Sequence, residues 1–342
     1  MRSPIRTIVV LALAALLLAV FLRNVDIRGV AGEILRAEPG WLLLSLLTMV
    51  ANLAVRAWRW QYLLEPLAPT TFANAFRATA VGFAANSVLP ARAGEVIRPY
   101  FLARQQHMSA TGAFATIILE RLLDMVTVLV LLAAYVFVFG RDLDATNPVA
   151  FAAVKWAGAT AAAAAVLALV GLFVLAGHPV WITQSLSRLE HVLPSKLAGM
   201  VARVTEKFAR GLGAIRRPGR LLVALVLSAP LWLCISLGIW AAARAFRLAV
   251  PFAGAFLIQA FLVLGVAVPT PGAVGGIHEA CGVGVTTFFG ADNSAAVGAA
   301  IVLHIFSIGP ALLLGLVFAA QEGLNVAGMR RLADQAEPGP TA

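Results

Sequence analysis

The chain has 342 residues, of which 61% are hydrophobic and only 12% are charged, and its mean hydropathy is +0.90. Soluble proteins carry roughly a quarter charged residues, so this composition excludes a soluble globular protein and indicates an integral membrane protein. The net charge of +10 is typical of basic cytoplasmic loops and of contact with anionic lipids, and we do not expect nucleic-acid binding. A β-barrel is excluded because the apolar segments do not alternate with polar residues.

Apolar segments close to the roughly 20 residues that a membrane-spanning helix needs recur along the chain. They lie at 7–22, 41–55, 113–139, 156–175, 221–243 and 295–319. The first resembles a signal peptide, but no cleavage motif precedes Arg23, and we expect it to be retained. The second carries polar residues every three or four positions, on one face of a helix; they are Ser45, Thr48, Asn52, Arg56 and Arg59.

Hydrogen bonding between helices would explain the serine and the threonine on that face. Arg56 and Arg59 suit either headgroup anchoring or substrate contact. The aromatic residues beside them, Trp58, Trp60 and Tyr62, are predicted to form an interfacial belt.

Two further apolar segments, about 72–89 and 252–268, are broken by proline and glycine, so neither can continue as a regular helix. An irregular backbone inside a membrane is tolerated only where it faces protein or water. We therefore predict that both segments dip into the membrane and return as re-entrant hairpins. The residues predicted to break the helices are Pro90, Gly94, Pro269, Pro271, Gly272, Gly275 and Gly276.

Charged residues cluster around the first break within strongly apolar sequence: Arg92, Glu95 and Arg98 next to it, and Glu120, Arg121 and Asp124 in the following span. A charge at bilayer depth costs at least a few kcal/mol, so such groups usually pair or line a wet cavity. Guanidinium groups match a lipid phosphate, and the carboxylates would either bind a cationic group or compensate the arginines. The alternative is purely structural pairing at i,i+3 spacing.

The two broken segments resemble each other, which suggests an internal repeat of about 72–139 and 252–320. A glutamate follows each break (Glu95 and Glu279), and a polar residue follows 25 positions later (Glu120 and His304). Three crossings separate the two breaks, so the halves would be inverted. Paired interrupted helices of this kind indicate transporter binding sites, and we expect Glu279 and His304 to face the first break across a central cavity.

The most basic loop, 178–220, carries an apolar helical stripe flanked by basic residues: Leu197, Val201, Val204, Phe208 and Ile215. This pattern predicts an amphipathic helix on an anionic leaflet, which places the loop and both termini in the cytoplasm. The resulting prediction is an all-α polytopic protein of the plasma membrane, with six full spans and two re-entrant hairpins. It would form one membrane domain over residues 1–330, followed by a disordered tail at 331–342.

These motifs resemble the lysylphosphatidylglycerol synthase transmembrane region family, also called flippase-like, over roughly residues 6–321. The likeness rests on N-x-x-x-P-x-R-x-G-E-x-x-R from Asn86, on E-R-x-x-D from Glu120, and on P-T-P-G from Pro269 with the later Gly275 and Glu279. The resemblance implies movement of a phospholipid or lipid-linked substrate between leaflets. Members that make aminoacylated phosphatidylglycerol carry a further cytosolic acyltransferase-like domain, and we expect the synthase activity not to apply here.

We therefore predict a transporter rather than an enzyme, without cofactor or metal. Two alternatives remain: a membrane-embedded enzyme using Glu95, Asp124, Glu279 or His304 as acid or base, and a non-catalytic partner of a separate lipid synthase. Cys234 and Cys281 are expected to be buried apolar residues. The candidate substrate-binding residues are Asn86, Arg92, Glu95, Arg98, Glu120, Arg121, Asp124, Glu279 and His304.

Overall fold

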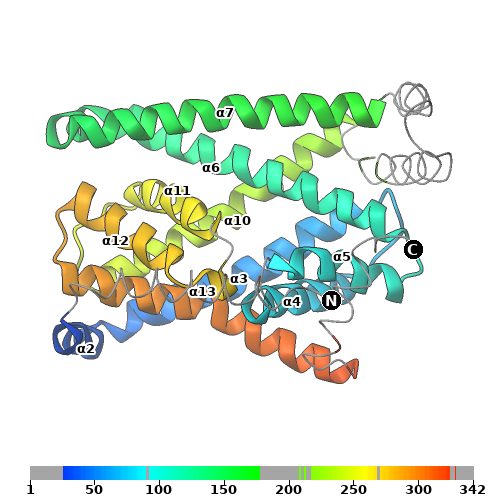
Figure 1. Cartoon of the computed structure of the whole chain (residues 1–342), viewed down its shortest axis with the longest axis horizontal. Helices are drawn as coiled ribbons and strands as arrows, with labels where there is room; N and C mark the ends of the chain where they lie inside the picture. Colours follow the sequence, from blue (N-terminus) through cyan, green and yellow to red (C-terminus); the bar gives the residue numbers. More distant parts are fainter. Residues whose placement is uncertain are drawn as a thin grey trace, which may run out of the picture.

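The computed structural model describes residues 26–89, 92–177, 208, 212, 217–267, 270–323 and 328, and within them every regular element is a helix (Figure 1). The fold class predicted from the sequence, an all-α polytopic membrane protein, is confirmed. The helices are α2 (Ile27–Arg36), α3 (Pro39–Leu64), α4 (Phe72–Val88), α5 (Gly94–Gln105), α6 (Ala110–Thr146), α7 (Pro148–Gly177), α10 (Pro218–Ala245), α11 (Gly254–Ala267), a 3-10 turn η3 (Pro271–Ala273), α12 (Gly276–Phe289) and α13 (Asn293–Gln321).

Among the described residues, five helices are long and apolar enough to cross a membrane: α3, α6, α7, α10 and α13. Each corresponds to a predicted span. The predicted first span at 7–22, most of the basic loop at 178–220 and the tail at 331–342 lie outside the described residues. Two residues of that loop, Phe208 and Leu212, pack against the cluster around Leu63 on α3, so Phe208 of the predicted stripe contacts protein.

The two broken segments form helix–break–helix hairpins, α4–α5 and α11–η3–α12. Their arms have 17, 12, 14 and 14 residues, or about 18–25 Å at the α-helical rise, which is shorter than the roughly 30 Å hydrocarbon core. Each pair of arms crosses at two glycines whose backbones touch, Gly82 with Gly94 and Gly265 with Gly276. The absence of side chains at these four positions lets the arms approach closely beside each break.

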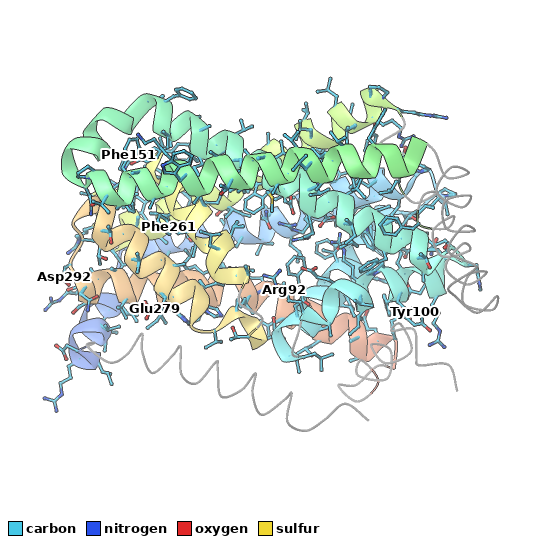
Figure 2. All side chains as sticks on the ribbon, turned by 45° about the horizontal axis from the view of Figure 1, so that its top comes forward. Arg92, Tyr100, Phe151, Phe261, Glu279 and Asp292 are labelled. Carbon is cyan, nitrogen blue, oxygen red and sulfur yellow. The ribbon has the colours of Figure 1, made fainter. Side chains whose placement is uncertain are left out.

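The hairpins open toward opposite ends of the molecule, and their breaks meet in the middle (Figures 1 and 2). In Figure 2, Tyr100 on α5 lies near one end and Asp292, before α13, near the other. At the centre the Arg92 side chain, held by a backbone with φ of 53°, donates a hydrogen bond to the Val266 carbonyl at the end of α11. A Cβ added to Gly272 of η3 would lie 3.8 Å from the Ser87 carbonyl oxygen of α4.

The helices around the two hairpins make matching contacts. α3 packs on α4 as α10 packs on α11, α5 packs on α6 as α12 packs on α13, and α3 and α10 pack against each other. The helices thus form two sets, α3–α6 and α10–α13. The last helix of each set also contacts the hairpin of the other set, since α6 contacts α11 and α13 contacts α4. α7 lies outside this arrangement, along α6 (Figure 1).

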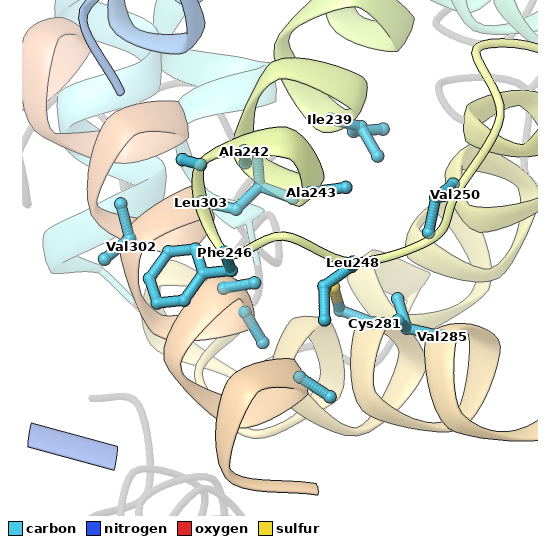
Figure 3. Packing of buried hydrophobic residues seen from close by; sticks show 14 of the residues in the cluster. Ile239, Ala242, Ala243, Phe246, Leu248, Val250, Cys281, Val285, Val302 and Leu303 are labelled. Atoms are coloured by element: carbon cyan, nitrogen blue, oxygen red, sulfur yellow. The ribbon is translucent and has the colours of Figure 1, made fainter. Parts of the chain in front are cut away.

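The interiors of the two sets differ. Between α10, α12 and α13 lies an apolar cluster that includes Ile239, Ala242, Cys281 and Leu303 (Figure 3). Between α3, α5 and α6 lies a network of charged residues.

Candidate functional site

Six charged side chains from three helices meet among the described residues: Arg56 and Arg59 of α3, Arg98 of α5, and Glu120, Arg121 and Asp124 of α6. The two arginines of α3 are three residues apart and the two carboxylates of α6 are four apart, so each pair lies on one face of its helix. Five of the six residues are buried, and the Arg121 side chain is 37% exposed.

Glu120 lies at the centre of the network. Its Oε1 accepts hydrogen bonds from Arg121 at 2.7 Å, Arg98 at 3.0 Å and Arg56 at 3.4 Å, and lies 3.7 Å from an Arg59 nitrogen. Its Oε2 is buried and has no hydrogen-bond partner among the described residues. One carboxylate oxygen thus joins guanidinium groups from α3, α5 and α6.

Asp124 links the network to α10. It is 2.7 Å from Arg59 and 3.1 Å from Arg56, and it accepts a hydrogen bond of 2.9 Å from the Trp232 indole N–H. Arg59 also donates to the Ser228 hydroxyl at 2.6 Å. A helix that packs with the second hairpin therefore helps to fix the charges beside the first.

Trp60 forms the apolar support of Arg98. The Arg98 guanidinium carbon lies 3.9 Å from the centre of the indole, a cation–π distance, and the indole N–H donates to the Thr116 hydroxyl at 3.0 Å. Trp60 is fully buried whereas Trp58 is 53% exposed. The predicted interfacial belt is therefore wrong for Trp60, because its ring packs inside the protein.

A small pocket opens beside the network where α4 and α5 cross. It is lined by Gly82, Phe83, Asn86, Gly94, Glu95, Arg98, Ile117 and Arg121. Glu95 lies 3.8 Å from Arg92, and both side chains are about one third exposed, at 29% and 35%. The pocket therefore brings together four of the residues predicted from the sequence: Asn86, Glu95, Arg98 and Arg121.

The network carries more positive than negative charge. Among its described members, four guanidinium groups face two carboxylates, and the Arg92–Glu95 pair adds one of each sign. Arginine stays protonated in proteins, so an excess of two positive charges remains next to the pocket. Such an excess suits the binding of an anion.

The second break carries a pair of stacked histidines beside Glu279, in the first turn of α12. His278 of α12 and His304 of α13 are buried, their ring centres lie 4.5 Å apart, and His278 Nε2 is 3.1 Å from His304 Nδ1. The Gly275 N–H donates to His278 Nδ1 at 3.3 Å, so one ring nitrogen of His278 contacts the start of α12 and the other contacts α13. The pair ties the start of α12 to α13.

The two candidates near the second break, Glu279 and His304, lie on α12 and α13. His304 contacts His278, and Glu279 lies on α12 apart from Arg92 in Figure 2. The described contacts do not bring either residue into the pocket. No group of three or more metal-binding side chains occurs among the described residues.

The family model described as the lysylphosphatidylglycerol synthase TM region matches residues 7–315. The chain belongs to this family. It is also similar to a UPF0104 membrane protein of Methanocaldococcus jannaschii, with 21% identity over 122 residues, which is 35% of this chain and 36% of that protein. The chain therefore aligns with about a third of that relative. Membership of this synthase TM region family, predicted from the motifs at Asn86, Glu120 and Pro269, is confirmed, and the protein is a multi-pass membrane protein.

Proposed function

We propose that this protein is a flippase-like transporter, not an enzyme, and that it moves a lipid or lipid-linked substrate between the leaflets of the plasma membrane. The observation that carries the proposal is the buried network with its positive excess beside a pocket at the first break. Buried charges in a membrane protein commonly mark a substrate pathway. A headgroup phosphate would bind to Arg98 and Arg121, while the acyl chains remain in lipid.

The arrangement of the hairpins supports transport. Interrupted helices whose breaks meet near the middle of the membrane form the central sites of many transporters. The contact from Arg92 to Val266 joins the two breaks directly. Movement of one hairpin against the other would break this contact and open the pocket toward one end of the molecule.

We also propose that α3–α6 and α10–α13 are two copies of one unit in opposite orientation. Gly82 and Gly265 have the same place in the two sets, and so do the first residues of α6 and α13; both pairs are separated by 183 residues. The same separation pairs Arg56, Arg59 and Glu120 with Ile239, Ala242 and Leu303. After the breaks, Gly94 and Gly276 are 182 residues apart and pair Arg98 with Ala280, whose Cβ lies against Gly265 as the Arg98 Cβ lies against Gly82. The copy with the charges would bind the headgroup, and the copy with the apolar interior would support it.

The basic loop at 178–220 gives the proposed orientation. It joins α7 to α10 at the end of the molecule where α3 ends and α4 begins, as the contact of Arg220 with Tyr62 and Glu65 supports. We propose that this end and both termini are cytoplasmic and that the loop contacts anionic lipids. A separate lipid synthase would be a natural supplier of substrate.

The test is leaflet exchange in vesicles that contain the purified protein and a fluorescent phospholipid, with an impermeant quencher reporting the outer leaflet. The Arg98→Gln and Arg121→Gln variants should lose exchange while remaining folded. The matched control is Arg77→Gln, because Arg77 on α4 lies over the Phe318 ring at 5.8 Å, outside the network. Unchanged exchange in both variants would contradict the proposal, and a chemically altered lipid would indicate an enzyme.

A further inference from the structure

We infer that the pocket selects a lipid whose headgroup ends in a phosphate monoester, which carries two negative charges, over a lipid with a singly charged phosphodiester. The inference rests on the proposed function for placing a lipid headgroup in the pocket. It adds the charge class of that headgroup.

The charge balance around the pocket favours a doubly charged anion. Together the network and the Arg92–Glu95 pair hold five guanidinium groups and three carboxylates among the described residues. An uncompensated charge in a low-dielectric interior is strongly unfavourable. A phosphodiester would offset half of the excess, whereas a phosphate monoester, with a second pKa near 6, would offset nearly all of it at neutral pH.

Two arginines that line the pocket carry buried nitrogen donors without a hydrogen-bond partner among the described residues. Arg98 is only 3% exposed and lines the pocket, yet its Nη2 and Nε have no hydrogen-bond partner among the described residues. Arg121 lines the same pocket, and its Nε is also without one there. Guanidinium groups bind phosphate oxygens through parallel charge-assisted hydrogen bonds.

The backbone next to these arginines also favours an anion. Gly94 and Glu95, the first two residues of α5, line the pocket. The start of a helix favours negative charge through its exposed N–H groups and its dipole. Helix and side chains therefore favour an anion at the same place.

Substitution of Glu95 distinguishes a phosphate monoester from a zwitterionic headgroup. An amine-bearing lipid would place its ammonium group against the Glu95 carboxylate, and loss of that carboxylate would weaken binding. A doubly charged phosphate is repelled by the same carboxylate, so Glu95→Gln should strengthen binding. The two headgroup classes thus predict opposite signs for one substitution at a partly exposed side chain.

The experiment measures binding of three probes to the purified full-length protein in detergent: short-chain phosphatidic acid, phosphatidylglycerol with the same chains, and inorganic phosphate. We expect phosphatidic acid to bind at least about tenfold more tightly than phosphatidylglycerol, as one more charge-assisted contact allows, and inorganic phosphate to bind more weakly than phosphatidic acid. Equal binding of the two lipids would overturn the charge class. Inorganic phosphate binding as tightly as phosphatidic acid would overturn the assignment to a lipid.

Variants localise the effect. Arg121→Gln should lower the affinity for phosphatidic acid by about tenfold and reduce its advantage over phosphatidylglycerol, Glu95→Gln should raise the affinity, and Arg77→Gln should change neither. Weaker binding in Glu95→Gln would overturn the inference in favour of an amine-bearing headgroup. Leaflet exchange is measured separately. Exchange without tighter binding of phosphatidic acid would overturn this inference but not the transport function. Tighter binding of phosphatidic acid without exchange would overturn the transport function but not this inference.

Discussion

The backbone of Gly94 lies directly against that of Gly82, and a Cβ on Gly94 would overlap the Gly82 carbonyl oxygen. The overlapping atom belongs to the backbone, so no side-chain rotation can relieve the clash. The two arms of the first hairpin can therefore cross only if both positions remain glycine.

Replacement of Gly94 by alanine should consequently separate α4 from α5 and destabilise the protein by about 1–3 kcal/mol or more, the usual cost of overpacking. Thermal unfolding of the purified protein in detergent measures this. Gly171→Ala on α7 is the control, because nothing lies within 4 Å of a Cβ added there. An equal unfolding temperature for the two variants would show that α4 and α5 do not approach each other closely at Gly82 and Gly94.

Loss of the Asp124 charge should be among the most damaging single changes. Asp124→Asn leaves Arg56 and Arg59 buried without their nearest carboxylate, and breaking a buried ion pair costs about 3–5 kcal/mol. The check is thermal unfolding, with Glu33→Gln as control, because Glu33 pairs with Arg36 at 3.8 Å on the surface and surface pairs contribute about 0–1 kcal/mol. Comparable losses in both variants would be inconsistent with this prediction.

The histidine pair should stabilise the second hairpin locally. His304→Leu removes the buried contact between the two rings, and the net loss of one hydrogen bond costs about 0.5–1.5 kcal/mol. Hydrogen–deuterium exchange should accelerate around residues 270–280 and remain unchanged in α4 and α5. His107→Asn is the control, since His107 is exposed and has φ of 51°, a conformation that asparagine tolerates. Uniform acceleration in both hairpins would argue against a local role.

The proposed orientation predicts which ends of the molecule are accessible from outside the cell. With Cys234 and Cys281 replaced by alanine, single cysteines at Arg36 and at Gly219 occupy exposed positions at opposite ends. An impermeant maleimide should label Arg36→Cys in intact cells and Gly219→Cys only after permeabilisation. The reverse pattern would invert the topology.

Much of the fold followed from segment length and from the positions of proline and glycine. The five described spans, and breaks before Gly94 and around Pro271–Gly276, occur where these features predicted them. Pro90 and Pro269, two of the residues predicted to break the helices, lie outside the described residues. The span at 41–55 was predicted too short, because apolarity ends at Arg56 while α3 continues to Leu64. The helix continues through two arginines because carboxylates of α6 neutralise them inside the protein.

The site was only partly predictable. Four of the predicted candidates share the pocket: Asn86, Glu95, Arg98 and Arg121. For Arg56 and Arg59 the sequence did not decide between headgroup anchoring and substrate contact. Their spacing showed a polar face, but which helix that face meets depends on packing between segments more than 60 residues apart. The role of Trp60 beneath Arg98 likewise depends on tertiary contacts that local pattern does not determine.

The contrast between the charged network and the apolar cluster of Figure 3 bears on how this protein can change over evolutionary time. Apolar neighbours such as Ile239 and Leu303 can be exchanged one at a time for residues of similar volume at small cost. A single exchange at Arg59 or Asp124 leaves a buried charge without its partner, so neutral drift is blocked there unless partners change together. Homologous chains should therefore vary gradually around the apolar cluster, and in coordinated steps around the charges.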